Sequence, residues 1–274
     1  MEIIQLTKKV DIDWTNIEIS LGVPPVAHLE NYSFDFEISP RDFLSFAQQN
    51  LKMNDKKGLI SALSNAKRAI DCQIDLVILF YGFNYSKFEK ANCYSQIKSL
   101  INEYEIENQK FSGVPFKLKF ITSFGIAPSF LVSKIRELRN KLEHEYKMPS
   151  KAEVREAVEV AELFINSTEN IITRNFYHSI FFGNNLYIDD SYNKPFFKIS
   201  YPEDNKDNKI LKQKYNEFKI TLFKNKETYI SKISPKNKKY IFLIKVLLGE
   251  FSYLVDVFDI DMERKYFNYK LIQK

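Results

Sequence analysis

The feature that most constrains the fold is a change of hydrophobic period near residue 175. Before that point apolar residues recur every three or four positions, which is typical of amphipathic helices, and after it they alternate with polar residues, as in strands. The 274 residues also exceed what one compact core usually needs. We therefore expect an α+β protein with an N-terminal arm over residues 1–40, an antiparallel helical bundle over 41–175 and a strand-rich domain over 176–274.

The N-terminal arm is expected to be extended. Pro24 and Pro25 exclude a helix at their position, and residues 33–39 alternate apolar and polar side chains, which predicts one short strand. Ser39-Pro40 then matches a helix start, because Ser is a good N-cap and Pro fits the first helical position.

Five apolar stripes predict the helices of the bundle. The longest ends at Gly82, a residue suited to a helix C-cap, and the last begins after Ser150, which forms a capping-box pattern with Glu153. The stripes cover residues 43–51, 59–81, 88–104, 130–146 and 154–171, and residues 116–124 add a short helix.

The strand-rich region is aromatic and modestly basic, with 18 Lys and Arg against 12 Asp and Glu in residues 176–274. Such an excess either solubilises the surface or attracts a polyanion. The turn at residues 183–185 predicts a hairpin, and residues 239–248 fit a buried strand or a short helix equally well. Strands are expected at 176–182, 186–188, 196–201, 215–223, 229–233 and 254–260.

Several classes of protein are disfavoured. The longest apolar run, at residues 240–249, is interrupted by Lys245, so no membrane span of about 20 residues is expected, and the N-terminus lacks the pattern of a signal peptide. We therefore expect a cytoplasmic protein, in which Cys72 and Cys93 are reduced, buried thiols.

Cofactor and metal sites are not expected either. The chain has seven glycines and no glycine-rich phosphate loop. Its three histidines, His28, His144 and His178, lie far apart in sequence and lack metal-ligand spacing.

One segment carries a chemical pattern. Arg139 and His144 have four residues between them, the polar Asn140 follows Arg139, and Tyr146 stands two residues after His144. This segment resembles the signature of the HEPN family (higher eukaryote and prokaryote nucleotide-binding domains), in the variant found in HEPN toxins. Flanking residues 43–51 and 62–71 look like the first long helices of that family, so the resemblance covers residues 41–175.

The resemblance implies a metal-independent endoribonuclease, a toxin or phage-defence effector. RNA supplies its own 2′-hydroxyl nucleophile, so cleavage needs a base of near-neutral pKa, the role of His144, and a cation for the phosphate, the role of Arg139. Asn140 lies four residues before His144, on the same side of a helix, and can orient the imidazole. One imidazole cannot be base and acid at once, so a homodimer with a composite site is expected, as HEPN ribonucleases are understood to form.

Arg136 and Tyr146 complete the candidate site as substrate-binding residues. Each also has a plain structural interpretation, because Arg136 fits an exposed helix charge and Tyr146 continues the apolar stripe of Leu138 and Leu142. The expected partners are RNA, a second copy of the chain and an antitoxin or regulatory protein. Two alternatives stay open: a non-catalytic HEPN module that binds a nucleotide, RNA or protein, and a sensor whose strand-rich part binds a small ligand.

Overall fold

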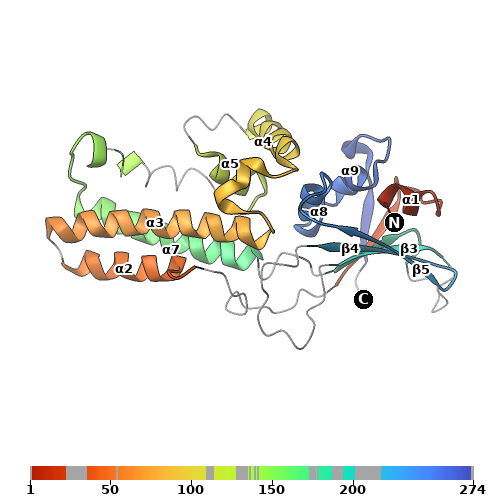
Figure 1. The fold of residues 1–274 in the computed structure, drawn as a ribbon, viewed down its shortest axis with the longest axis horizontal. Helices are drawn as coiled ribbons and strands as arrows, with labels where there is room; N and C mark the ends of the chain where they lie inside the picture. The colour runs from red at the N-terminus through yellow and green to blue at the C-terminus, as the bar shows by residue number, and fades with distance from the viewer. Residues whose placement is uncertain are drawn as a thin grey trace.

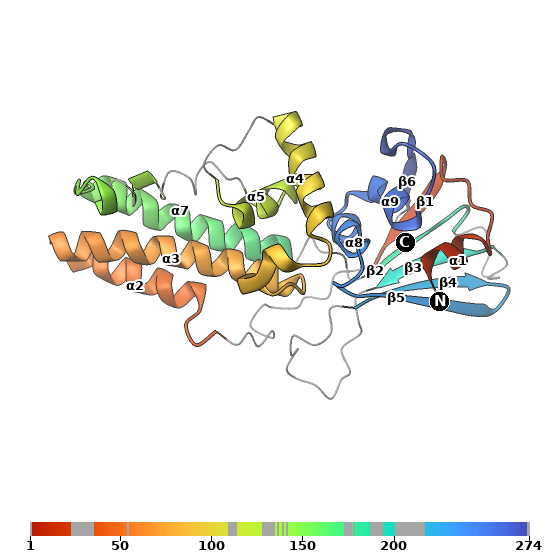
Figure 2. The same cartoon turned by 45° about the horizontal axis from the view of Figure 1, so that its top comes forward.

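A computed structural model gives the architecture as a helical part beside a sheet covered by short helices (Figure 1). The helices α2, α3 and α7 run side by side at one end of the molecule, and α4 and α5 lie between them and the sheet (Figures 1 and 2). The structure describes residues 2–22, 36–53, 55–108, 114–127, 135, 137, 138, 140, 142–172, 177, 179–186, 194–200 and 217–272.

The helical part is built on α3 (Lys56–Phe80), against which α2 (Pro40–Met53) and α7 (Lys151–Asn170) pack. The predicted ends of these helices are confirmed. Ser39 and Asp42 bond reciprocally at the start of α2, with backbone N to Oδ2 at 2.8 Å and backbone N to Oγ at 3.1 Å. At the end of α3, Gly82 has φ +84° and the amide of Phe83 donates to the carbonyl of Ile78, which is a Schellman cap.

The interface of α3 and α7 contains one buried polar pair. The amide Nε2 of Gln73 donates to Oγ1 of Thr168 at 2.8 Å, and this hydroxyl donates in turn to the carbonyls of Phe164 and Ile165. Both side chains are fully buried among apolar neighbours. The pair therefore fixes the register of the two helices.

The stripe predicted over residues 88–104 is two helices. A 3-10 helix, η2 (Tyr85–Lys90), is capped by Asn84 and followed by α4 (Tyr94–Asn108), and residues 91–93 separate them. Asn84 Oδ1 accepts from the amides of Ser86 and Lys87 at 3.0 and 3.1 Å, which starts η2 ahead of the predicted span, and the break at residues 91–93 falls inside it. The short α5 (Phe116–Ser123) follows, as expected.

The sheet has six strands in the order β5-β4-β3-β2-β1-β6. Its strands are β1 (Ile17–Leu21), β2 (Ser179–Gly183), β3 (Phe196–Ser200), β4 (Phe218–Lys224), β5 (Glu227–Ile233) and β6 (Tyr269–Ile272). All pairs are antiparallel except β1 with β6. The N-terminal strand thus lies inside the sheet, between β2 and β6, and the segment expected as an arm shares hydrogen bonds with C-terminal strands.

One face of the sheet is covered by short helices. They are α1 (Ile3–Thr7), α8 (Tyr240–Leu247), η4 (Phe251–Tyr253) and α9 (Leu254–Phe258), and η5 (Arg264–Tyr266) precedes β6. The ring of Phe258 lies 5.5 Å from that of Phe182 and 5.0 Å from that of Phe197. On the same face, Phe218 stacks on Tyr240 at 4.9 Å, so aromatic residues dominate this part of the core.

Two predictions about strands are wrong, and a third lies largely outside the described residues. Residues 36–39 are not a strand, because Ser39 caps α2, and the N-terminal strand is instead β1. Residues 254–258 form α9, since the buried Leu254, Val255, Val257 and Phe258 make one helical face against the sheet. Leu186 is not in a strand, and residues 187–188, the rest of the second strand of the predicted hairpin, lie outside the described residues.

Asn184 lies in the turn where the hairpin is predicted. Its side chain bonds the backbone of the loop before β1, with Nδ2 donating to the carbonyl of Asn16 at 2.7 Å and Oδ1 accepting from the amide of Asp13 at 2.8 Å. The turn residues therefore anchor a strand that is remote in sequence. The segment that fitted strand or helix, residues 239–248, is the helix α8.

The architecture is α+β, as expected, with a mixed sheet. The HEPN arrangement of the bundle and the domain boundaries at residues 40 and 175 stay predictions. Of the helices that the structure describes, none combines the length and hydrophobicity that a membrane span requires.

Candidate functional site

The segment that carries the predicted site is a helix that ends at the molecular surface. Residues 135, 137, 138, 140 and 142–144 have helical hydrogen bonding, and Ile135 is buried against the core. Asn140 and His144 are both exposed. They lie four residues apart, so both side chains project from one side of the helix into solvent.

The helix terminates directly after His144. Tyr146 has φ +56°, a left-handed conformation that costs a residue with a Cβ about 1–2 kcal/mol and prevents the helix from continuing. Its side chain is 86% exposed. The interpretation of Tyr146 as a core residue is therefore wrong: Leu138 and Leu142 pack against the core, but the change of backbone direction turns Tyr146 outward.

The start of α7 follows a few residues after His144 and is held by side-chain hydrogen bonds. The capping box expected at Ser150 is confirmed: its Oγ accepts from the amide of Glu153 at 3.2 Å, and its own amide donates to Oε2 of Glu153 at 2.7 Å. Pro149 before it is buried. Only five residues therefore separate His144 from an anchored position, which restricts the loop that carries Tyr146.

The two predicted arginines, Arg136 and Arg139, lie outside the described residues, as do His28 and His178. Of the predicted site the structure describes Asn140, His144 and Tyr146, and all three are exposed.

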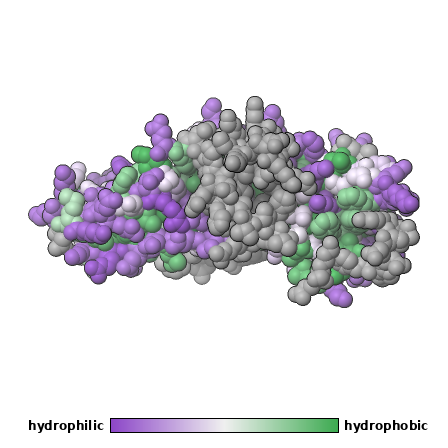
Figure 3. Space-filling model, turned by 90° about the horizontal axis from the view of Figure 1, so that it is seen from below, coloured by the Kyte–Doolittle hydropathy of each residue, from purple (hydrophilic) through white to green (hydrophobic). Residues whose placement is uncertain are grey.

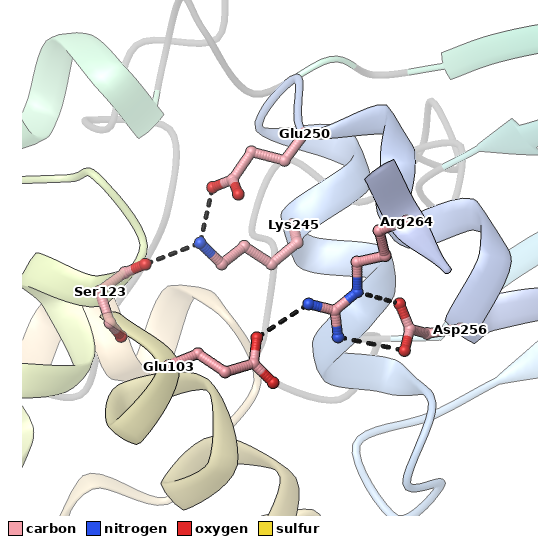
Figure 4. Close-up of polar contacts among 6 residues, drawn as sticks. All are labelled: Glu103, Ser123, Lys245, Glu250, Asp256 and Arg264. Atoms are coloured by element: carbon pink, nitrogen blue, oxygen red, sulfur yellow. Dashed lines mark hydrogen bonds and ion pairs between the residues drawn. The ribbon is translucent and has the colours of Figure 1, made fainter. Parts of the chain in front are cut away.

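A second polar cluster lies where α4 and α5 meet the C-terminal helices (Figure 4). At its centre, Lys245 of α8 is only 5% exposed. Its ammonium donates to the carbonyl of Ser123 at 2.7 Å and to Oε1 of Glu250 at 2.6 Å, and lies 4.7 Å from the ring centroid of Phe124. Burial lowers the pKa of Lys245, and the carboxylate of Glu250 partly opposes this.

The geometry around Lys245 follows from a glycine. Gly249 has φ +96°, and the amide of Glu250 donates to the carbonyl of Lys245 at 3.0 Å. This Schellman cap turns the chain back, so the carboxylate of Glu250 meets the ammonium five residues earlier.

Arg264 forms the other half of the cluster. It binds both carboxylate oxygens of Asp256, with Nε to Oδ2 at 2.6 Å and Nη2 to Oδ1 at 3.1 Å, and reaches Oε2 of Glu103 on α4 with Nη1 at 2.8 Å. Its guanidinium lies 4.0 Å from the ring centroid of Tyr253. The hydrogen bonds to Asp256 and Glu103 raise the pKa of Arg264 against the opposing effect of burial, and burial raises the pKa of Tyr253.

Sequence reasoning missed this cluster. Its one local signal is Lys245 itself, a charge inside an otherwise apolar run, which indicates a buried cation that needs acceptors. Lys245 bonds Ser123 and Arg264 bonds Glu103, and both partners are so far away in sequence that no spacing rule finds them. Lys245 and Arg264 are each already paired with a carboxylate, so we assign the cluster a structural role. It joins the helical part to the C-terminal elements.

The cysteines and the possible metal ligands among the described residues offer no further reactive site. Cys93 is buried as expected, whereas Cys72 is only half-buried. Burial raises the pKa of Cys72 to about 11 and that of Cys93 to about 12, so both are thiols at neutral pH. The described residues contain no group of three or more His, Cys, Asp or Glu side chains arranged to hold a metal ion. No family model, curated protein or solved structure matches the chain.

Proposed function

We propose that the protein is a metal-independent endoribonuclease of the HEPN type, acting as a toxin or phage-defence effector on RNA in the cytoplasm. The observation that carries the proposal is the exposed pair of Asn140 and His144 on one side of a helix that ends at the surface. A base that must meet a large substrate needs this accessibility, which a core histidine lacks.

The proposed reaction needs no group beyond side chains and RNA. His144 removes the proton from the 2′-hydroxyl, whose oxygen attacks the adjacent phosphorus, and the bond from phosphorus to the 5′-oxygen breaks. A proton must reach that leaving oxygen. Arg139 stabilises the charge on the phosphate oxygens, Asn140 orients the imidazole, and Arg136 and Tyr146 contact the substrate.

The proton for the leaving group comes from a second imidazole in this proposal. Two copies of the chain, related by a two-fold axis, bring two His144 side chains to one phosphodiester, one as base and one as acid. An antitoxin or regulatory protein that covers this helix end would silence the enzyme.

The test is cleavage of purified total RNA by the full chain in EDTA. We expect fragments with wild type, and a rate reduced by roughly 10²–10⁴-fold with His144→Ala and Arg139→Ala. Arg155→Ala is the matched control, because Arg155 is an exposed arginine on α7 outside the proposed site, and we expect wild-type cleavage from it. Absence of cleavage by wild type, or equal cleavage by His144→Ala, contradicts the proposal.

A second candidate function is a non-catalytic HEPN module that binds a nucleotide, RNA or protein. The exposed apolar side chains of Tyr146 and Met148 beside His144 favour it, since such residues commonly make interfaces. Partner binding retained by His144→Ala, together with no RNA products under any condition, would support this alternative.

A further inference from the structure

The sheet has one face that the short helices do not cover. Side chains alternate between the two faces along a strand, and Phe182 and Phe197 point to the helix-covered side, where both contact Phe258. The outer face is therefore made by the positions between them. The outer face is defined by the side chains of residues 18, 20, 179, 181, 196, 198, 200, 219, 221, 223, 228, 230, 232, 270 and 272, of which 20, 179, 200 and 221 are buried.

A row of aromatic rings crosses the outer face from β2 to β4. The rings of Phe181 and Phe196 have centroids 6.5 Å apart, and those of Phe196 and Phe223 stack at 4.7 Å with an interplanar angle of 16°. All three are partly exposed, whereas aromatic residues on the helix-covered side of the same strands are buried. Burial in the core thus does not explain this row.

Lysines surround the aromatic row. Lys198 stands between the strands of Phe181 and Phe223, with its ammonium 5.4 Å from the ring centroid of Phe181, and Lys219 is exposed. Lys232 and Lys270 are the other cations of the face. Lys232 is paired with Glu217 at 3.0 Å.

Two carboxylates lie at the outer face among the described residues: that of Glu18, which accepts from the amide of Leu186 at 2.6 Å, and that of Glu217, which pairs with Lys232. Figure 3 views the molecule from this side and shows hydrophobic atoms at the surface over the sheet, next to hydrophilic ones. The combination is an aromatic surface with a positive charge.

We propose that the outer face binds single-stranded RNA, with bases stacking on Phe181 and Phe223 and phosphates lying near Lys198 and Lys219. Bases stack on aromatic side chains and lysines attract the backbone, so the pairing of the two residue types fits this ligand. A protein partner fits less well, because lysine is depleted at the centre of protein interfaces. The choice of RNA over DNA rests on the proposed function, and the face would hold the substrate of that reaction.

The experiment measures binding of a fluorescent, unstructured RNA oligonucleotide by anisotropy, in the His144→Ala chain so that the RNA stays intact. The test variant is Phe181→Leu with Phe223→Leu, because leucine keeps apolar bulk in the sheet and removes the stacking surface. The control is Tyr266→Leu, which alters an exposed aromatic residue on η5, outside the outer face. Thermal unfolding confirms that each variant is folded.

We expect the double variant to bind RNA roughly tenfold or more weakly, and the control to bind as the parent does. Lys219→Ala should lower the slope of log affinity against log salt by roughly 0.7, whereas Lys265→Ala, on η5, should leave it unchanged. Unchanged affinity in the double variant overturns the proposal and leaves a protein as the occupant of the face. Tighter binding of a DNA oligonucleotide of the same sequence overturns the assignment to RNA.

Failure of this proposal is distinguishable from failure of the proposed function. RNA cleavage by wild type with unchanged binding in the double variant removes the outer face and keeps the nuclease. Lost binding in the double variant with no cleavage by wild type keeps the outer face and removes the nuclease.

Discussion

Replacing Arg264 should weaken the junction between the helical part and the C-terminal elements. The bidentate pair with Asp256 is partly buried, with 30% and 24% of the two side chains exposed, so its charged hydrogen bonds contribute about 1.5–3 kcal/mol. The link to Glu103 is more exposed at 43% and adds about 0.5 kcal/mol. The contact with Tyr253 adds about 0.5–1 kcal/mol. We expect Arg264→Ala to lower the free energy of unfolding by about 3 kcal/mol.

The replacement Arg264→Lys separates geometry from charge. Lysine keeps the positive charge but cannot bind both carboxylate oxygens in parallel or lie flat on the ring, so we expect a loss of about 1–2 kcal/mol. Arg155→Ala is the control, with a change within about 0.5 kcal/mol, because Arg155 is exposed on α7.

The assay is urea unfolding followed by circular dichroism, with a double-mutant cycle of Arg264→Ala and Glu103→Gln. The cycle should give a coupling of about 0.5 kcal/mol, which isolates the link from η5 to α4. A stability of Arg264→Lys equal to wild type would refute the argument from bidentate geometry. A loss below about 0.5 kcal/mol in Arg264→Ala would refute the role of the cluster as a junction.

Three further predictions concern groups outside that cluster. Among the described residues Gln73 Oε1 has no hydrogen-bond partner, so Gln73→Leu should change the free energy of unfolding by less than about 1 kcal/mol. Thr168→Val removes the acceptor of the buried Gln73 amide and should lower the free energy of unfolding by about 1–3 kcal/mol. Urea unfolding measures both variants, and equal effects would contradict the expected difference. Tyr146→Gly should raise the free energy of unfolding by about 0.5–1 kcal/mol because φ is +56°, and Tyr146→Ala should not; a loss with glycine would contradict the left-handed backbone. Cys93, which is buried and has a pKa of about 12, should react with Ellman's reagent at pH 8 only after unfolding in urea, and its fast reaction in a folded Cys72→Ser chain would show that it is not buried.

Helix ends were predictable because their signals are local. Ser39-Pro40, Gly82 and Ser150 each fix the hydrogen bonds of a few neighbouring groups, and the structure has a cap at all three. The strands β3, β4 and β5 were predictable for a similar reason, since one face of each is buried and alternation records it.

The misplaced elements depend on long-range contacts. Residues 17–21 alternate as clearly as 33–39, and pairing with β2 and β6 decides which segment becomes a strand. Residues 254–258 are too few for their period alone to separate a strand from a helix, and packing of Phe258 on the aromatic side chains of the sheet selects the helix.

The candidate functional residues likewise include some that local sequence predicts and some that only long-range contacts bring together. Asn140 and His144 were found by spacing along one helix, and their exposure is what that spacing allows. The cluster of Lys245 and Arg264 joins α4 and α5 to α8 and α9, so only the folded chain assembles it. Tyr146 shows that one left-handed residue ends an apolar stripe that composition alone would extend.

The most direct test of the account is the chemistry of the RNA ends. In EDTA, the protein should cut an RNA oligonucleotide to leave a 2′,3′-cyclic phosphate and a 5′-hydroxyl, because the 2′-oxygen is the proposed nucleophile. A single 2′-deoxy substitution at the cleaved position should abolish cutting there. Cutting that persists at the deoxy position, or products with a 5′-phosphate, would contradict the proposed role of His144.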